Sequence, residues 1–236
     1  MPHQFGKNYR AAAEKVEKGR LYAPQEAVDL VRGMGSDHFD PTVEAHLRLG
    51  IDPRHADQAV RTTLVLPHGT GKVRRIAVFA TGEKAREATE AGADIVGGED
   101  LVKQVQAGQI YFDVALATPD VMNLVGRIGK ILGPRGLMPN PKAGTVTFDI
   151  AKAIHEVQGG RIEVRNDRLG NVHAVIGRAS FDDTRLRDNF AALMDAVVRA
   201  KPSAAKGTYV KTVTLCTTHG PGVKVDPTQA SKLQVA

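Results

Sequence analysis

The middle of the chain repeats one pattern, in which a short apolar run precedes a stretch with the features of a helix. Gly92 and Gly108 each follow such a stretch and predict its end, because glycine readily adopts the left-handed conformation that terminates helices. Short apolar strands that alternate with helices are typical of a parallel sheet covered on both faces. The predicted strands cover residues 75–80, 93–96, 112–117 and 145–148, and the predicted helices cover residues 83–91, 99–107, 119–132 and 149–158.

The segments on either side of this block predict strands with one buried and one solvated face. In residues 42–49 apolar side chains alternate with polar ones, so the polar ones share one side of the strand. A helix of about 18 residues is expected after Asp182 and Asp183, which suit a helix N-terminus. Further strands are predicted at residues 61–66, 161–165, 171–176, 209–217 and 223–225, with residues 166–170 as a hairpin connection.

These two kinds of segment predict an α/β chain of two domains. Each flank alone is too short for a comfortable hydrophobic core, whereas the two flanks together can bury one. We therefore expect residues 1–67 and 159–236 to form one discontinuous domain, with residues 68–158 inserted as a second domain. Three serial pieces are the alternative arrangement.

The charge of the chain favours an anionic partner. The net charge is +6, and residues 159–236 hold twelve Lys and Arg against seven Asp and Glu. A solvated basic surface explains the same excess equally well. Because the sequence has no run of 18 apolar residues and no apolar signal segment, we expect a cytoplasmic protein without membrane contact.

The motifs of common enzyme and metal sites are missing from the sequence. A phosphate-binding loop around Gly71 would need glycine and Ser or Thr where the chain has Leu66 and Val73. The eight histidines show no helical i, i+4 pair, and a single cysteine, Cys216, excludes a multi-cysteine zinc site. We predict no enzyme, no cofactor and no metal. A nucleotide- or phosphate-using α/β enzyme with a site built from distant residues is the alternative, and a DNA-binding regulator lacks the usual motifs.

Polar side chains in the flanks suit contact with RNA. Phe39, in a polar loop, is either a stacking platform for a base or a core anchor. Hydroxyls, amides and backbone N–H groups at turns are the groups that bind ribose and phosphate, although such residues also occupy turns for conformational reasons. The candidates on the strand face are Thr42, Glu44, His46 and Arg48, and those at the two turns are Arg165, Asn166, Arg168, Thr217, Thr218, His219 and Gly220.

Residues 121–148 contain no acidic residue. Proline and glycine are so frequent in residues 133–144 that neither a helix nor a strand interior is expected there. This surface loop is either a second anionic contact or a structural crossover. Its cations, with those of the preceding helix, are Arg127, Lys130, Arg135 and Lys142.

Several stretches resemble one known family. Residues 117–122 (ATPDVM) and 129–142 (GKILGPRGLMPNPK) closely resemble the signature of the bacterial large-subunit ribosomal protein number one family. The match continues in order through FDPTVE, LGIDPR, GRIEVRND and TTHGP, and so covers almost the whole chain.

The resemblance implies an α/β sandwich RNA-binding domain made from both termini, with an inserted Rossmann-like domain joined by a hinge. It implies a structural ribosomal protein, a monomer within the ribosome, that binds 23S rRNA at the exit-site stalk. Two further roles are implied, assistance to the release of deacylated exit-site tRNA and repression of its own operon through binding of the operon mRNA. The family's RNA contacts carry over to Phe39, Thr42, Glu44, Arg165, Asn166, Arg168, Thr217, Thr218 and Gly220, and the matched LGIDPR stretch adds Arg54. His219 departs from the methionine usual in the family.

Overall fold

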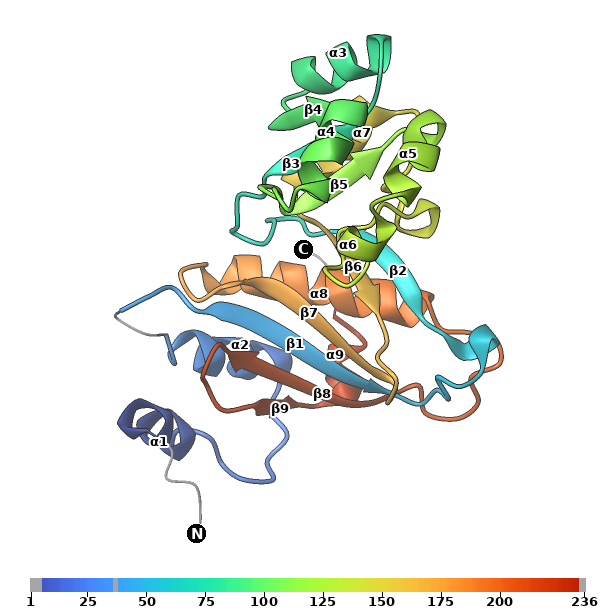
Figure 1. Cartoon of the computed structure of the whole chain (residues 1–236). Helices are drawn as coiled ribbons and strands as arrows, with labels where there is room; N and C mark the ends of the chain where they lie inside the picture. The colour runs from blue at the N-terminus through green and yellow to red at the C-terminus, as the bar shows by residue number, and fades with distance from the viewer. Residues whose placement is uncertain (1–5, 36–37, 234–236) are drawn as a thin grey trace. The chain divides into compact units, whose positions relative to one another are not determined.

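The computed structural model describes residues 6–35 and 38–233 of the chain. The residues cluster into two compact units, which we call the terminal unit (Met1–Gly71 and Gly160–Ala236) and the inserted unit (Lys72–Gly159) (Figure 1). Residues 68–71, assigned to the inserted domain from the sequence, cluster with the terminal unit. There the side chain of Asn189 accepts from the His68 N–H at 3.0 Å and donates to Gly69 O at 2.8 Å.

The terminal unit is built on a four-stranded antiparallel sheet in the order β7-β1-β8-β9. The strand predicted at residues 42–49 is confirmed, because alternation of buried and polar side chains gives β1 one apolar face. Helices α2 and α8 cover that apolar face and lie behind the sheet in Figure 1. The elements are β1 (Thr42–Leu49), β7 (Asn171–Arg178), β8 (Val210–Thr217), β9 (Val223–Val225), α2 (Pro24–Arg32) and α8 (Asp183–Arg199).

Helix α8 begins where its sequence predicts. The Asp182 carboxylate accepts a hydrogen bond from the Arg185 N–H at 2.8 Å and so caps the first turn. Phe190, Leu193 and Val197 lie on its buried face and pack in the core of the unit. Among the described residues, the sequence analysis did not predict the helices α1 (Lys7–Glu14), α2 and α9 (Pro227–Ala230).

The hairpin predicted at residues 166–170 is wrong. The strand before this loop, β6 (Arg161–Arg165), pairs with β2 (Arg61–Val65) in a separate two-stranded sheet, whereas β7 after the loop pairs with β1. Only one bridge, between Asn166 and Val172, joins the two sides of the loop within the described residues. Turn residues fix a change of direction but not the strand that becomes the neighbour. A 3₁₀ turn, η1 (Ala56–Gln58), precedes β2.

The inserted unit confirms the parallel sheet with helices on both faces. Its strand order is β4-β3-β5, and both strand pairs are parallel. Because β3 is buried on both sides, Ala77 and Phe79 pack in one apolar cluster and Ile76 and Val78 in another. The elements are β3 (Ile76–Phe79), α3 (Glu83–Glu90), β4 (Ile95–Gly97), α4 (Glu99–Gln106), β5 (Val114–Ala117) and α7 (Ile150–Gln158).

Two expectations for the inserted unit are wrong. The helix predicted at residues 119–132 is divided into η2 (Pro119–Val121), α5 (Met122–Gly126) and α6 (Gly129–Leu132), and the glycines at 126 and 129 weaken a continuous helix. Residues 145–148 form no strand. They make a single parallel bridge between Val146 and Ala117, beyond the turn η3 (Pro141–Ala143).

Candidate nucleic-acid interface

The sheet of the terminal unit has one face that α2 and α8 do not cover. We call it the polar face and define it by the side chains of β1, β7 and β8 that point away from the core. Register places Glu44 beside Cys216, and places His46 between His173 and Thr214. All of these side chains are partly or fully exposed. The polar face consists of Glu44, His46, Arg48, Asn171, His173, Thr212, Thr214 and Cys216.

At one end of the polar face, the turn after β8 is fastened to the start of β1. The Thr218 N–H donates to Thr42 O at 3.0 Å, and the Thr42 N–H donates to Thr218 Oγ1 at 3.2 Å. Thr217 is buried, so its side chain packs inside this turn. A Cβ on Gly220 would lie 2.2 Å from Thr217 Oγ1, so this close approach requires glycine. His219 has a φ of 65°, a left-handed conformation that is uncommon for residues other than glycine, although histidine adopts it more often than most.

Phe39 lies beside this turn and is 46% exposed, which excludes its role as a core anchor. Its ring meets the His219 ring edge to face, with centroids 6.2 Å apart and planes at 77°. Together with Thr218 and Gly220 they line part of a cavity of about 490 Å³. An exposed aromatic ring on the wall of a surface cavity is an arrangement on which a nucleobase can stack.

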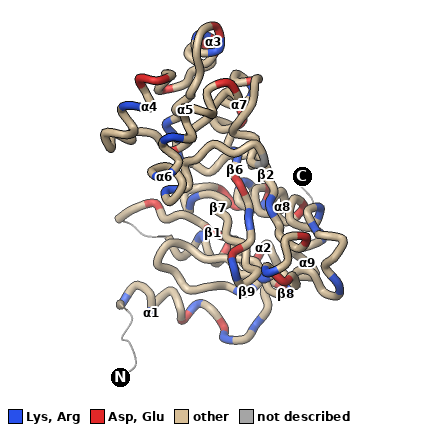
Figure 2. Tube along the Cα trace, turned by 45° about the vertical axis from the view of Figure 1, so that its right-hand side comes forward, with Lys and Arg blue, Asp and Glu red and all other residues tan. Residues whose placement is uncertain are grey.

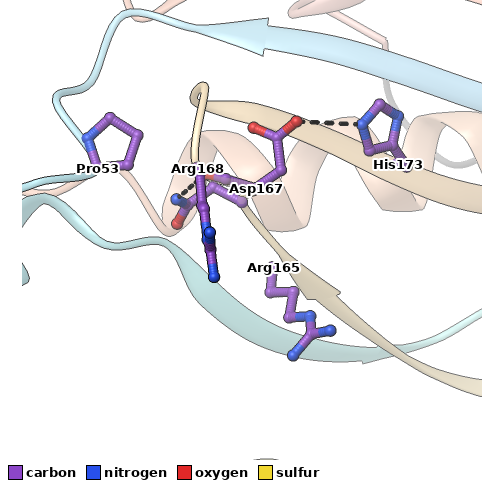
Figure 3. A pocket seen from close by; sticks show the side chains of 6 residues that line it. Pro53, Arg165, Asp167, Arg168 and His173 are labelled. Atoms are coloured by element: carbon purple, nitrogen blue, oxygen red, sulfur yellow. Dashed lines mark hydrogen bonds and ion pairs between the residues drawn. The ribbon is translucent and has the colours of Figure 1, made fainter. Parts of the chain in front are cut away.

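At the other end of the polar face, residues of the loop between β6 and β7 line a cavity of about 670 Å³ (Figure 3). Arg165 and Arg168 are exposed there. Asn166 is held by the protein itself, because its Oδ1 accepts from the Val60 N–H at 2.7 Å and its Nδ2 donates to Asp167 O at 2.8 Å. Asn166 therefore links the end of β6 to the residue that precedes β2. The cavity is lined by Pro53, Arg165, Asn166, Asp167, Arg168 and His173.

Asp167 organises this loop. Its carboxylate accepts hydrogen bonds from the backbone N–H groups of Leu169 at 2.8 Å and Asn171 at 2.7 Å. These bonds, that of Asn171 first, lower the pKa of Asp167 to about 2. Its other oxygen lies 3.5 Å from His173 Nε2, as drawn in Figure 3. Arg54 is exposed in the neighbouring loop, where its N–H donates to Asp52 Oδ1 at 3.0 Å.

In the middle of the polar face, two histidine rings and a cysteine thiol lie within hydrogen-bonding distance of one another in a row. His46 Nδ1 lies 2.8 Å from His173 Nδ1, and His46 Nε2 lies 3.2 Å from Cys216 Sγ. Burial and the neighbouring His173 lower the pKa of His46, which favours the neutral ring. Burial, with the nearby Glu44, raises the pKa of the Cys216 thiol. Arg48 Nη1 donates to Asn171 Oδ1 at 3.2 Å and extends the network along the strand.

The acid-free stretch belongs to the inserted unit. Arg127, Lys130 and Arg135 are all exposed. Figure 2 shows basic positions around α6, where Lys130 lies. The side chain of Lys142 lies outside the described part of the structure.

A family model described as the ribosomal protein L1p/L10e family matches residues 31–221. The chain belongs to this family. It is 61% identical to the large ribosomal subunit protein uL1 of Corynebacterium diphtheriae over 221 residues, 94% of each chain. The protein of the same name from Chloroflexus aurantiacus is 58% identical over 234 residues, which cover 98% of this chain and 99% of the relative.

Membership of the ribosomal protein L1p/L10e family confirms the resemblance drawn from the sequence, and its proteins are structural ribosomal proteins and not enzymes. The alternative of a phosphate-using α/β enzyme is therefore wrong. Within the described residues, the helices are too short or too polar to cross a bilayer.

The interface residues that were not among the sequence candidates are Pro53, Asp167, Asn171, His173, Thr212, Thr214 and Cys216. Asp167 lay inside the predicted turn, and the acceptor role of an Asp in a turn was the available signal. His173 alternates with buried residues on β7, as His46 does on β1. The contact among His46, His173 and Cys216 joins three strands, so only the sheet order reveals it.

Proposed function

We propose that this chain binds large-subunit rRNA through the polar face of its four-stranded sheet and the turns at both ends of that face. The main support is that residues far apart in the sequence come together on one face of the sheet. Strand and turn candidates separated by more than a hundred residues in sequence lie on the same uncovered face, between a stacking ring at Phe39 and the cations Arg165 and Arg168. Membership of a ribosomal protein family supports RNA as the ligand.

The two ends of the polar face offer different groups to RNA, so they should contribute different kinds of binding energy. The turn with Thr218 and Phe39 offers a hydroxyl and a ring, which suit ribose and base, whereas Arg165 and Arg168 suit phosphate. Log affinity should therefore fall with log salt with a slope that reflects a few phosphate contacts, and stacking should leave a salt-resistant remainder.

Matched arginine variants test the proposal. Arg168→Ala should weaken binding of an rRNA stalk fragment and reduce the salt slope by about one contact. Arg199→Ala is the control, because Arg199 is equally cationic, is exposed, and lies on α8 at the opposite face of the sheet. Equal losses in both variants, or no loss in either, would remove the polar face from the proposal.

The turn end is tested by Phe39→Ala and Thr218→Ala. Loss of a stacked base costs about 1–3 kcal/mol, and loss of a desolvated hydroxyl about 1 kcal/mol. Because Phe39 is nearly half-exposed and lies outside the core cluster, its replacement should leave the melting temperature nearly unchanged. Unchanged rRNA affinity in both variants would contradict a role for this turn.

We further propose that the chain acts within the cytoplasmic ribosome at the exit-site stalk, where the inserted unit assists release of deacylated tRNA. The exposed Arg127, Lys130 and Arg135 supply the positive charge that a tRNA backbone requires. Arg127→Ala combined with Lys130→Ala and Arg135→Ala should slow tRNA release in a reconstituted ribosome while rRNA binding is preserved. Unchanged release would assign the loop a structural role.

The last part of the proposal is that the rRNA site also binds the leader of the protein's own operon mRNA and represses its translation. Its support is what the resemblance of the sequence to the bacterial family implies. Added protein should repress a message with that leader in a translation extract, and excess rRNA fragment should relieve the repression. Repression that ignores the competing rRNA would refute a shared site.

A further inference from the structure

Three side chains of the polar face converge on one point from two strands. Glu44 and His46 are two residues apart on β1 and so project from the same face, and Cys216 on β8 is the register partner of Glu44. One ligand atom from each of the three lies within 4.8 Å of the other two. His46 Nε2 is 3.2 Å from Cys216 Sγ and 3.6 Å from Glu44 Oε2.

Two of these separations, 3.2 Å and 3.6 Å, are close to those between neighbouring ligands of a tetrahedral metal ion, and the third is below 4.8 Å. Zinc binds nitrogen and oxygen at about 2.0–2.2 Å and sulfur at about 2.3 Å, which places neighbouring ligand atoms about 3.3–3.8 Å apart. The three atoms therefore need only small side-chain rotations to surround one ion. All three residues are half-buried, so a fourth position faces solvent.

A second observation shows that His46 is oriented for this role. Asp167 lies beside His173 Nε2, and His173 Nδ1 lies 2.8 Å from His46 Nδ1. If His173 donates its Nε2 proton to the carboxylate, its Nδ1 must accept, and His46 must donate from Nδ1. The lone pair of His46 Nε2 then points toward Cys216 and Glu44. A carboxylate behind a histidine is the usual outer support of a metal ligand.

We propose that Glu44, His46 and Cys216 form a binding site for a divalent ion of the zinc class, with His173 and Asp167 as its outer support. On binding, the thiol loses its proton to solvent and a metal–sulfur bond forms. The thiolate, the Glu44 carboxylate and the neutral imidazole together balance the two positive charges of the ion. Water completes the coordination at the fourth position. Thiolate, imidazole and carboxylate form a ligand set that suits zinc better than calcium or magnesium.

Titration of the untagged, full-length, metal-free protein with Co²⁺ tests the site, in a reductant that does not bind metals. One equivalent should bind and produce the charge-transfer absorption of a cobalt–thiolate bond together with the strong visible bands of tetrahedral cobalt. Zn²⁺ should then displace the cobalt. Cys216→Ser should abolish the charge-transfer band, whereas His155→Gln, which alters an exposed histidine of α7, should change nothing.

The outer support gives a sharper readout. His173→Ala leaves all three ligands in place and should lower metal affinity about 10- to 100-fold. If Cys216→Ser fails to fold, as judged by circular dichroism, Glu44→Gln replaces it and should weaken binding while the thiolate band remains. Absence of saturable binding, cobalt bound without a thiolate band, or full affinity in His173→Ala would overturn the proposal.

Discussion

The turn after β8 offers a clean test of how packing shapes the interface. Gly220→Ala would place a Cβ 2.2 Å from Thr217 Oγ1, far inside van der Waals contact. Its other near neighbours, Thr217 Cβ and Thr217 N, lie at 3.4 Å and are acceptable contacts. The φ of Gly220 is also open to any residue. The whole cost of the substitution therefore comes from one oxygen atom.

The size of that cost follows from the burial of Thr217. Because Thr217 is only 3% exposed, its hydroxyl cannot move into solvent without disturbing the turn. Overpacking of this kind costs about 1–3 kcal/mol. Thr217→Ala removes the clashing oxygen. By itself it loses about 0.8 kcal/mol for a buried methyl group, offset in part because Thr217 Oγ1 has no hydrogen-bond partner within the described residues.

The assay is a double-mutant cycle in urea, with the m-value used to check that unfolding stays two-state. Gly220→Ala should lower the free energy of unfolding by about 1–3 kcal/mol in the natural background and by much less beside Thr217→Ala. The rRNA affinity should fall in Gly220→Ala and recover in the double variant, because Thr218 and His219 belong to the same turn. If Gly220→Ala costs the same in both backgrounds, the contact with Thr217 Oγ1 does not explain the glycine.

Three further predictions follow from the terminal unit. Because the pKa of Asp167 is lowered to about 2 from an unfolded value of about 3.9, its stabilisation is complete above about pH 5 and is lost as the pH falls toward 2. Asp167→Asn should flatten the acid limb of a stability–pH profile, and an unchanged limb would contradict this role. Burial raises the pKa of Tyr209 to about 12, and its hydroxyl has no partner among the described residues. Tyr209→Phe should therefore match or exceed the natural stability by up to about 1 kcal/mol and remove a loss of stability between about pH 10 and 12, whereas a clear drop in stability would reveal a missed partner. Replacing Lys72–Gly159 by a short Gly/Ser linker should leave a protein that folds cooperatively and binds rRNA, because Gly160 packs directly on the backbone of Gly69. A molten product would refute the two-domain arrangement.

The sequence predicted those features that depend on local periodicity. Residues 42–49 alternate cleanly, so both the bounds of β1 and its polar side were readable. Val121, Val125, Ile128 and Leu132 recur at helical spacing and are all buried, although the helix predicted at residues 119–132 is interrupted. Periodicity reports which side chains face inward, and it does not report whether the backbone hydrogen bonds continue.

Features that depend on the order of strands in a sheet could not be predicted from the sequence. The loop at residues 166–170 looks like a hairpin turn, yet its two strands pair with β2 and β1, at partners 96 to 136 residues away in the sequence. The same limit applies to the site. Glu44 and His46 were identified as polar candidates, but Cys216 is 170 residues from His46, and only the pairing of β1 with β8 brings them together.

Hydrogen exchange of the protein with and without an rRNA stalk fragment tests the central claim most directly. Binding of the fragment should slow the exchange of backbone amides at the two ends of the polar face, in residues 38–42, 166–170 and 217–220. Helix α8, on the covered face, should exchange at the same rate in both states. Protection confined to α8, or to residues 121–148 of the inserted unit, would contradict the claim that the polar face binds rRNA.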